Sequence, residues 1–257
     1  MSPATSMGRR APPLSDLLTQ SEQETRVALA ACYRLMAHFR MSDTIYTHLS
    51  ARLGGDGDHL LINPFGLHFE EITASSLIKV SIEGDIIDDS TGLGINRAGF
   101  IIHSAIHEAR PDIDWVFHSH SVAGAAVSAQ RHGLLPISQH AQVFIGRIAY
   151  HDHEGISVIE DERARLISDF GDNDVMILRN HGLLVGGRTP GQAMFRMLTL
   201  ERACQMQIAA LAGSAELVIP PPEVALATQT ALASHDFGLD WSALMRLAYR
   251  IAPGFDR

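Results

Sequence analysis

Apolar positions in the first hundred residues recur with two different periods, and each period predicts one kind of element. Helical spacing of Val27, Leu35 and their neighbours predicts a first helix over residues 21–39, with Ser21 and Glu24 as a capping box at its start. Short apolar runs separated by Gly, Pro and Asp turns then predict antiparallel strands. These strands are expected at 43–53, 60–62, 78–82 and 86–87, with a short helical turn at 73–77.

Further helical and extended patterns follow along the rest of the chain. Helices are expected over 98–109, 123–130, 160–170 and from Thr189-Pro190 to about Leu211. Extended segments are expected at 115–121, 149–150 and 175–178. By composition and pattern, the chain divides into a mobile N-terminal arm at 1–20, one domain at 21–213, and a C-terminal linker and final helix at 214–257.

Composition and charge restrict the class of function. The chain has 257 residues, of which 46% are hydrophobic, so it can bury a sizeable core. Its formal net charge of -9 argues against a nucleic-acid partner. It has no apolar run of about 20 residues and no apolar signal-peptide core, so we expect a cytoplasmic protein without membrane insertion. Cys32 and Cys204 lie in helix-like apolar contexts and are expected to be buried thiols.

Two histidines at the end of an apolar run give the first indication of chemistry. His118 and His120 are two residues apart, so on a strand they lie on the same face, close enough to share one metal ion. A pair alone is equally typical of surface imidazoles, and a metal site needs a third ligand. His181 is the best candidate, because a second apolar run at 175–178 also leads to a histidine beside a glycine turn.

Other polar residues near strand ends and turns are weaker candidates for the same site. His48 and Gln142 are candidates for substrate binding, although His48 is also explained as a strand-face histidine. Ser121 is a third such candidate and a possible cap for the helix after it, whose N-terminus would favour an anionic group. His103 and His140 are candidates for proton transfer. His103 and His107 share one helical face, so they are candidates for groups that lie near the metal, and a capping or surface role explains them equally well.

On its ordered motifs, the chain resembles the class II aldolase/adducin family, and within it the head domain of adducin more than the sugar-phosphate aldolases. The motifs extend over roughly residues 22–213. They include Pro64-Phe65-Gly66-Leu67, Thr73-Ala74-Ser75-Ser76-Leu77, Asn96-Arg97-Ala98-Gly99-Phe100, Ala109-Arg110-Pro111-Asp112, His118-Ser119-His120 and Leu178-Arg179-Asn180-His181-Gly182-Leu183. The resemblance implies a three-layer α/β/α fold around a mainly antiparallel sheet, and a homotetramer with the active site at a subunit interface. It also implies a divalent metal held by His118, His120 and His181, with zinc expected first and Fe²⁺ or Mn²⁺ as alternatives.

One position departs from the catalytic members of that family. Where they place an acidic residue for proton transfer, this chain has Gly99, and no carboxylate lies between Asn96 and Ile106. Loss of a positioned acid or base costs about 10²–10⁴-fold in rate, so cleavage of the usual sugar phosphates is not expected. Gly99→Glu is expected to restore at most a trace of it.

Three functions are consistent with these features. The first is a metal-dependent lyase of aldolase type that acts on a small oxygenated carbonyl or acid compound. The second is a non-haem iron oxygenase or decarboxylase on the same fold, because three histidines with open coordination also suit ferrous iron. The third is a non-enzymatic module for oligomerisation and binding, like the adducin head. The C-terminal segment from Trp241 to Tyr249 is expected to pack on a neighbouring subunit or to cover the metal pocket, because the body looks complete at about Leu211.

Overall fold

The fold is taken from a computed structural model that describes residues 22–54, 58–155, 160–213, 216–232 and 234–257. The expected N-terminal arm and the Ser21 cap lie outside these residues. A single eight-stranded sheet has the strand order β4-β3-β2-β1-β5-β8-β7-β6. Neighbouring strands are antiparallel except β6 and β7, which are parallel. The strands are β1 (His48–Arg52), β2 (His59–Ile62), β3 (Ile78–Ser81), β4 (Ile86–Asp88), β5 (Trp115–Ser119), β6 (Ile148–His151), β7 (Val175–Leu178) and β8 (Gly182–Gly187).

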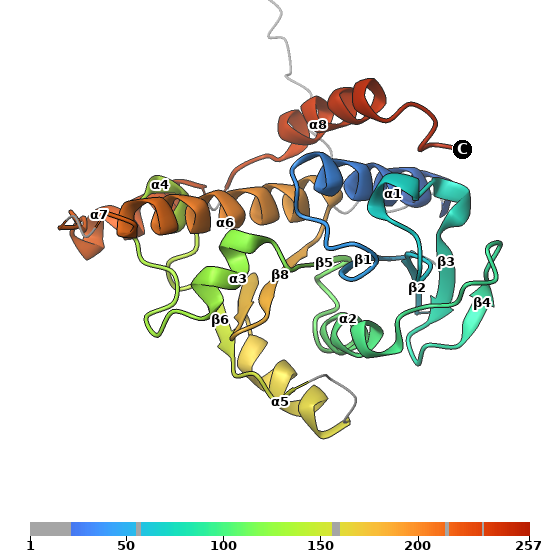
Figure 1. Ribbon diagram of the computed structural model, residues 1–257, viewed down its shortest axis with the longest axis horizontal. Helices are drawn as coiled ribbons and strands as arrows, with labels where there is room; N and C mark the ends of the chain where they lie inside the picture. Colours follow the sequence, from blue (N-terminus) through green and yellow to red (C-terminus); the bar gives the residue numbers. More distant parts are fainter. Residues whose placement is uncertain (1–21, 55–57, 156–159, 214–215, 233) are drawn as a thin grey trace, which may run out of the picture.

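Helices cover both faces of this sheet. One face carries α1 and α6 with α8 outside them, and the opposite face carries α2 and α5 (Figure 1). The helices are α1 (Glu22–His38), α2 (Arg97–Ala109), α3 (Val122–Ser128), α4 (Gln139–Gln142), α5 (Glu160–Phe170), α6 (Pro190–Leu211), α7 (Pro222–Leu232) and α8 (Gly238–Ile251), with 3₁₀ turns at Phe69–Glu71 and Ala74–Ser76. The three-layer α/β/α fold with a mainly antiparallel sheet is therefore confirmed.

Strand β5 lies near the middle of the sheet and is buried along its whole length. Trp115 and Phe117 point into the core shared with α1 and α6, whereas Val116 packs with apolar residues of α2 and α5. Because side chains alternate along a strand, His118 faces the same side as Val116. The hydrophobic alternation of β5 therefore directs His118 towards α2.

Strand β8 was not predicted, because its glycines suggested a turn instead. A Cβ at Gly182 would lie 2.3 Å from the carbonyl oxygen of Ser119, and one at Gly187 would lie 2.7 Å from the backbone nitrogen of Ala193. Neither position has room for a side chain, because the backbones of β5 and α6 approach it too closely. Glycine here permits the close packing that brings the turn before β8 to the end of β5.

The C-terminal region contains two helices, α7 and α8, where the sequence predicted one. Helix α8 packs on α1 and α6, and its Trp241, Leu244 and Leu247 contact the apolar core. The end of the chain is also bound to the 3₁₀ turn at Ala74–Ser76, because the backbone carbonyl of Phe255 accepts a hydrogen bond from the backbone N–H of Ala74 at 2.8 Å. The body is thus not complete at Leu211. Within one chain, α8 lies on the face opposite to the side chain of His118, so it does not cover the histidines.

Two further expectations can be compared with this fold. Both Cys32 and Cys204 are free and buried, as predicted. Among the residues that the structure describes, no helix combines the length and apolar character needed to cross a membrane.

Candidate metal centre

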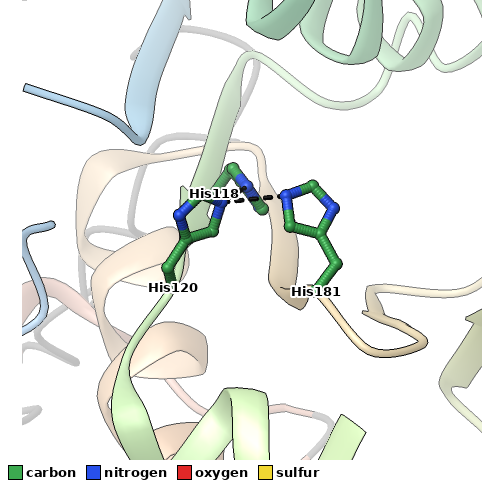
Figure 2. A group of neighbouring side chains, drawn as sticks. All are labelled: His118, His120 and His181. Atoms are coloured by element: carbon green, nitrogen blue, oxygen red, sulfur yellow. Dashed lines mark hydrogen bonds between the residues drawn. The ribbon is translucent and has the colours of Figure 1, made fainter. Parts of the chain in front are cut away.

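The side chains of His118, His120 and His181 converge at the end of β5. The Nε2 atoms of His118 and His120 are 2.9 Å apart, and those of His120 and His181 are 2.8 Å apart. Figure 2 shows the three imidazole rings pointing toward one another, two from the end of β5 and one from the turn between β7 and β8. The structure thus brings together all three residues that the sequence proposed as metal ligands.

Two of the three rings are oriented by hydrogen bonds from their other nitrogen. His118 Nδ1 donates to the backbone carbonyl of Leu183 at 2.9 Å, and His120 Nδ1 donates to Asp43 Oδ2 at 2.9 Å. A neutral imidazole with its proton on Nδ1 has a lone pair on Nε2. Two such lone pairs facing each other repel unless a cation lies between them. This donor set fits a divalent metal, whose histidine ligands are usually held in this way by a carbonyl or carboxylate.

The turn that carries His181 has a left-handed residue immediately before it. Asn180 has φ 54°, a conformation that asparagine tolerates better than most side chains. The backbone N–H of His181 lies within hydrogen-bonding distance of both the carbonyl of Leu178 and the hydroxyl of Ser128 on α3. The turn is therefore fixed to the sheet and to α3, which defines the position of the third imidazole.

The loop between α1 and β1 carries Asp43 and is also strained. Three of its non-glycine residues have positive φ: Arg40, Thr44 and Thr47. Thr47 is β-branched, 2% exposed, and its Oγ1 has no hydrogen-bond partner in the structure. Each such residue costs about 1–3 kcal/mol, and strain of this kind is concentrated at functional sites. Sequence reasoning missed Asp43, because nothing in the local pattern connects it to a histidine 77 positions away.

A second group of histidines lies directly behind the first. His48 on β1 pairs with His118 on β5, and their ring centroids are 5.1 Å apart. His48 Nδ1 lies 2.7 Å from His103 Nε2, Ser50 Oγ lies 2.5 Å from His103 Nδ1, and the same Oγ lies 2.8 Å from His107 Nε2. The side chains of His103 and His107 are fully buried. Of the alternatives that the sequence left open for these two residues, the surface role is therefore wrong.

Burial keeps most of these imidazoles neutral. It lowers the pKa of His48, His103 and His118 well below the usual range, and neighbouring imidazoles lower it further. Burial also lowers the pKa of His181 to about 4 and that of His107 to about 3. Metal ligation requires neutral imidazole, so at neutral pH His118 and His181 are already in the protonation state that binds a metal.

Acid should destabilise the metal-free protein. His107 has a pKa of about 3 when folded and an ordinary value of 6.5, so below pH 6.5 the unfolded chain binds a proton that the folded protein does not. The stability present above pH 6.5 is therefore lost as pH falls towards 3, by about 1.4 kcal/mol per pH unit for this residue. Urea unfolding with chelator at pH 7, 6 and 5 measures the slope. His107→Gln should reduce it by about that amount, and an unchanged slope would assign the acid sensitivity elsewhere.

The remaining candidate residues have other partners. Ser121 does not cap α3, because its hydroxyl donates to Glu201 on α6. Gln142 is buried, and its amide bonds the carbonyl of Pro136 and the hydroxyl of Thr228 on α7. His140 lies on α4, which packs on α6 and α7 rather than on the strands that carry the three histidines.

Beside His181 lies a cavity of about 10 Å³, which is room for about one water molecule. Its lining includes His151, His153 and Arg179. The side chain of His120 is a quarter exposed, whereas His118 is buried, so the group of three histidines opens to solvent on the side of His120. The cavity that the described residues form beside His181 is therefore smaller than a typical substrate site.

A sequence model described as the Class II Aldolase and Adducin N-terminal domain matches residues 27–208. The chain belongs to this family. The resemblance noted from the sequence motifs is thereby confirmed, and the three converging histidines lie within the matched residues.

Similar proteins in this family differ in the activities that their names describe. An aldolase II superfamily protein from Pseudomonas syringae is 52% identical, with a TM-score of 0.89 over 95% of this chain and 99% of that one. L-fuculose 1-phosphate aldolase from Glaciozyma antarctica PI12 is 30% identical, with a TM-score of 0.80 over 94% of each chain. Alpha-adducin of Rattus norvegicus is 47% identical over 197 residues, which are 76% of this chain and 27% of that protein.

The structure gives a steric reason for the glycine at position 99 of this class II aldolase family member. Gly99 lies in the first turn of α2, where its N–H donates to the side chain of Asn96. A Cβ at this position would lie 2.0 Å from Nε2 of His48. The His48 ring therefore occupies the space that a side chain at 99 needs. Gly99→Glu cannot fit unless His48 moves, so restoration of aldolase activity by that single substitution is not expected.

Proposed function

We propose that the protein is a divalent-metal-dependent lyase of aldolase type that acts on a small oxygenated carbonyl or acid compound. The observation that carries this proposal is the convergence of three Nε2 atoms, two of them with their Nδ1 protons anchored on Leu183 and Asp43. A structural zinc site normally has four protein ligands, whereas three histidines leave a coordination position for a substrate. The similarity to a protein named as an aldolase supports the same reaction class.

Each residue of the site has a defined task in this proposal. His118, His120 and His181 would hold the metal, and Asp43 and the carbonyl of Leu183 keep the first two rings in the binding tautomer. When bound, such a metal polarises a carbonyl oxygen and stabilises negative charge that develops on it. The left-handed residues before His48 and His181 preset the backbone, so the histidines are positioned before any ligand binds.

Zinc is the metal that we propose, with Fe²⁺ or Mn²⁺ as alternatives. All three ligands are imidazole nitrogens, which suit zinc and ferrous iron better than they suit magnesium or calcium. In a tetrahedral zinc complex with bonds of 2.0–2.1 Å, the Nε2 atoms would be about 3.3 Å apart. They are 2.8 and 2.9 Å apart here, so small side-chain rotations would be enough for binding.

The proposal can be tested on purified full-length protein. Metal content per chain is measured first, and carbon–carbon cleavage is then followed on L-fuculose 1-phosphate and on unphosphorylated hydroxy acids and hydroxy ketones. We expect about one zinc per chain, and cleavage of an unphosphorylated compound that is lost on chelation and regained with zinc. L-fuculose 1-phosphate should react slowly, because Gly99 supplies no acid or base.

Other results would support the other functions. Protein that holds no stoichiometric metal and has unchanged stability in chelator would indicate a binding module like the adducin head. Turnover that requires both ferrous iron and oxygen would indicate an oxygenase. Rapid cleavage of L-fuculose 1-phosphate would support the lyase class but show that another residue replaces the missing acid.

We also propose that the protein acts as a cytoplasmic homotetramer with its active site completed at a subunit interface. The small cavity beside His181 supports this, because the described residues of one chain form a space there that is smaller than a typical substrate site. Large apolar side chains are also exposed in the C-terminal region, at Val218, Ile219, Val224, Leu226 and Leu239. The two buried, unpaired cysteines suit a reducing compartment.

Removal of residues 223–257 should reduce the oligomer size and lower stability. The deletion removes the apolar contacts of α8 with α1 and α6 together with most of the exposed apolar side chains of α7. Light scattering after size-exclusion chromatography measures the assembly. A second variant, Val224→Ser/Leu226→Ser, retains α8, so it separates the effect on oligomer size from the effect on stability. A full-length protein that is monomeric at all concentrations would contradict the proposal.

A further inference from the structure

A continuous line of buried hydrogen bonds runs from the interior to the three histidines. It starts at the backbone carbonyl of Ile113, which lies 3.2 Å from His107 Nδ1. It continues through Ser50 and His103 and ends at His48, with three links of 2.5–2.8 Å. Every side chain in the line is at most 5% exposed. Water therefore has little opportunity to replace any of these links.

The backbone carbonyl of Ile113, at the inner end of the line, determines which group donates in each hydrogen bond. A carbonyl only accepts, so His107 carries its proton on Nδ1, and Nε2 of this neutral ring must accept from Ser50. The single hydroxyl proton of Ser50 is then used, so Ser50 accepts from His103 Nδ1. His103 Nε2 in turn accepts from His48 Nδ1. His48 is left with no proton on Nε2.

His48 lies where this tautomer can influence a bound molecule. Its ring packs against His118 and fills the space beside Gly99, which is the position where other family members are expected to carry their acid. Its backbone is fixed by pairing with β5, and the left-handed Thr47 precedes it. The position of the ring and the location of its lone pair are thus both determined by the fold.

We propose that His48 contacts the substrate beside the three histidines and accepts a hydrogen bond from a substrate hydroxyl through its unprotonated Nε2. In this inference, which rests on the proposed function, Ser50, His103 and His107 are positioning residues that maintain the tautomer of His48. The contact depends on which nitrogen of the neutral His48 ring holds the proton. The ring does not change its charge.

This contact narrows the class of substrate. A lone pair attracts a hydroxyl and repels a carbonyl or carboxylate oxygen at the same place. The expected substrate therefore carries a hydroxyl next to the oxygen that faces the three histidines, as in a 2-hydroxy acid or a hydroxy ketone. A substrate analogue without this hydroxyl should bind about 5–100-fold more weakly, because a buried acceptor is then left unpaired.

Neutron diffraction from a deuterated crystal of the zinc-loaded protein reads the proton positions directly. We expect density for deuterium on Nδ1 of His48, His103 and His107 and none on Nε2 of His48. A deuteron on His48 Nε2 would overturn the inference. The measurement needs neither a variant nor turnover, so it remains informative if the lyase activity is absent.

Two hydroxamates that differ by one hydroxyl test the contact with a ligand. Glycolohydroxamate and acetohydroxamate both chelate zinc, and only the first carries the additional hydroxyl. Calorimetric titration of the zinc-loaded protein should show tighter binding of glycolohydroxamate by about 5–100-fold. The difference should disappear in His48→Ala and shrink in Ser50→Ala, which retains His48 but interrupts the line. Ser104→Ala, a buried serine on α2 outside the line, should retain the difference.

The outcomes distinguish this inference from the proposed function. Equal affinity for the two hydroxamates in the wild-type protein, or an unchanged difference in His48→Ala, would overturn the inference while leaving the zinc site intact. Unchanged zinc content in each variant confirms that the comparison concerns His48 alone. A selective His48 contact in a protein that cleaves no substrate would overturn the lyase proposal and retain the ligand contact.

Discussion

Alanine in place of His118, His120 or His181 should abolish stoichiometric zinc binding and leave the protein folded. In the proposed site each residue supplies one of three nitrogen ligands. Its loss should therefore weaken zinc binding by more than the 10–100-fold that is typical of losing a partner that orients a ligand. The fold should persist because the sheet is held by apolar strands packed between helices, not by the ion. This behaviour contrasts with zinc fingers, which unfold without their metal.

Elemental analysis after dialysis and thermal melting of each metal-free variant provide the two measurements. Asp43→Asn is the matched control, because it changes the partner of His120 and leaves all three ligands in place. It should weaken zinc binding by about 10–100-fold without abolishing it. A histidine variant that retained full zinc occupancy would have to be removed from the ligand set.

Gly99→Ala should destabilise the protein, although alanine normally stabilises a helix by about 1 kcal/mol relative to glycine. The added Cβ would lie 2.0 Å from His48 Nε2, well inside van der Waals contact. Overpacking of a buried site typically costs about 1–3 kcal/mol. The hydrogen bond between His48 Nδ1 and His103 Nε2 restrains the His48 ring, so it cannot move aside freely. The effect should therefore have the opposite sign to that of an ordinary helical glycine.

A double-mutant cycle isolates the contact between the two residues. In a His48→Ala background, the space beside position 99 is open, so Gly99→Ala should become stabilising by about 0.5–1 kcal/mol. Urea unfolding of the four proteins in chelator measures the coupling energy. If the effects of the two substitutions on the free energy of unfolding were additive, His48 would not fill the space beside Gly99. The glycine at position 99 would then need another explanation.

Periodicity was sufficient to predict most of the helices and strands and the three candidate ligands, whereas the three-layer arrangement was predicted from the resemblance to the family. An apolar run that ends in histidine directs that residue to a strand end, and this applies to His118, His120 and His181. The partners that orient them follow no such rule. Asp43 and the carbonyl of Leu183 meet their histidines only through tertiary packing, across 77 and 65 positions. The role of Ser50 depends on one hydroxyl that donates to His107 and accepts from His103, which local sequence does not specify.

The errors have similar physical causes. Strand β8 was missed because Gly182 and Gly187 disfavour a strand in isolation, whereas packing against β5 and α6 requires them. His103 and His107 were considered possible surface residues because helical spacing alone does not show which face is buried. Their position became clear only when α2 was placed against β1.

The mutual exclusion of the His48 ring and any side chain at position 99 restricts the order in which this site can evolve. A lineage that exchanges Gly99 for a carboxylate must first replace His48 by a smaller residue, because the reverse order passes through a protein with two groups in one space. The intermediate with small residues at both positions should fold but lacks both groups. Residues 48 and 99 should therefore change together among relatives, and the pair of residue types at these positions should separate subfamilies better than either position alone.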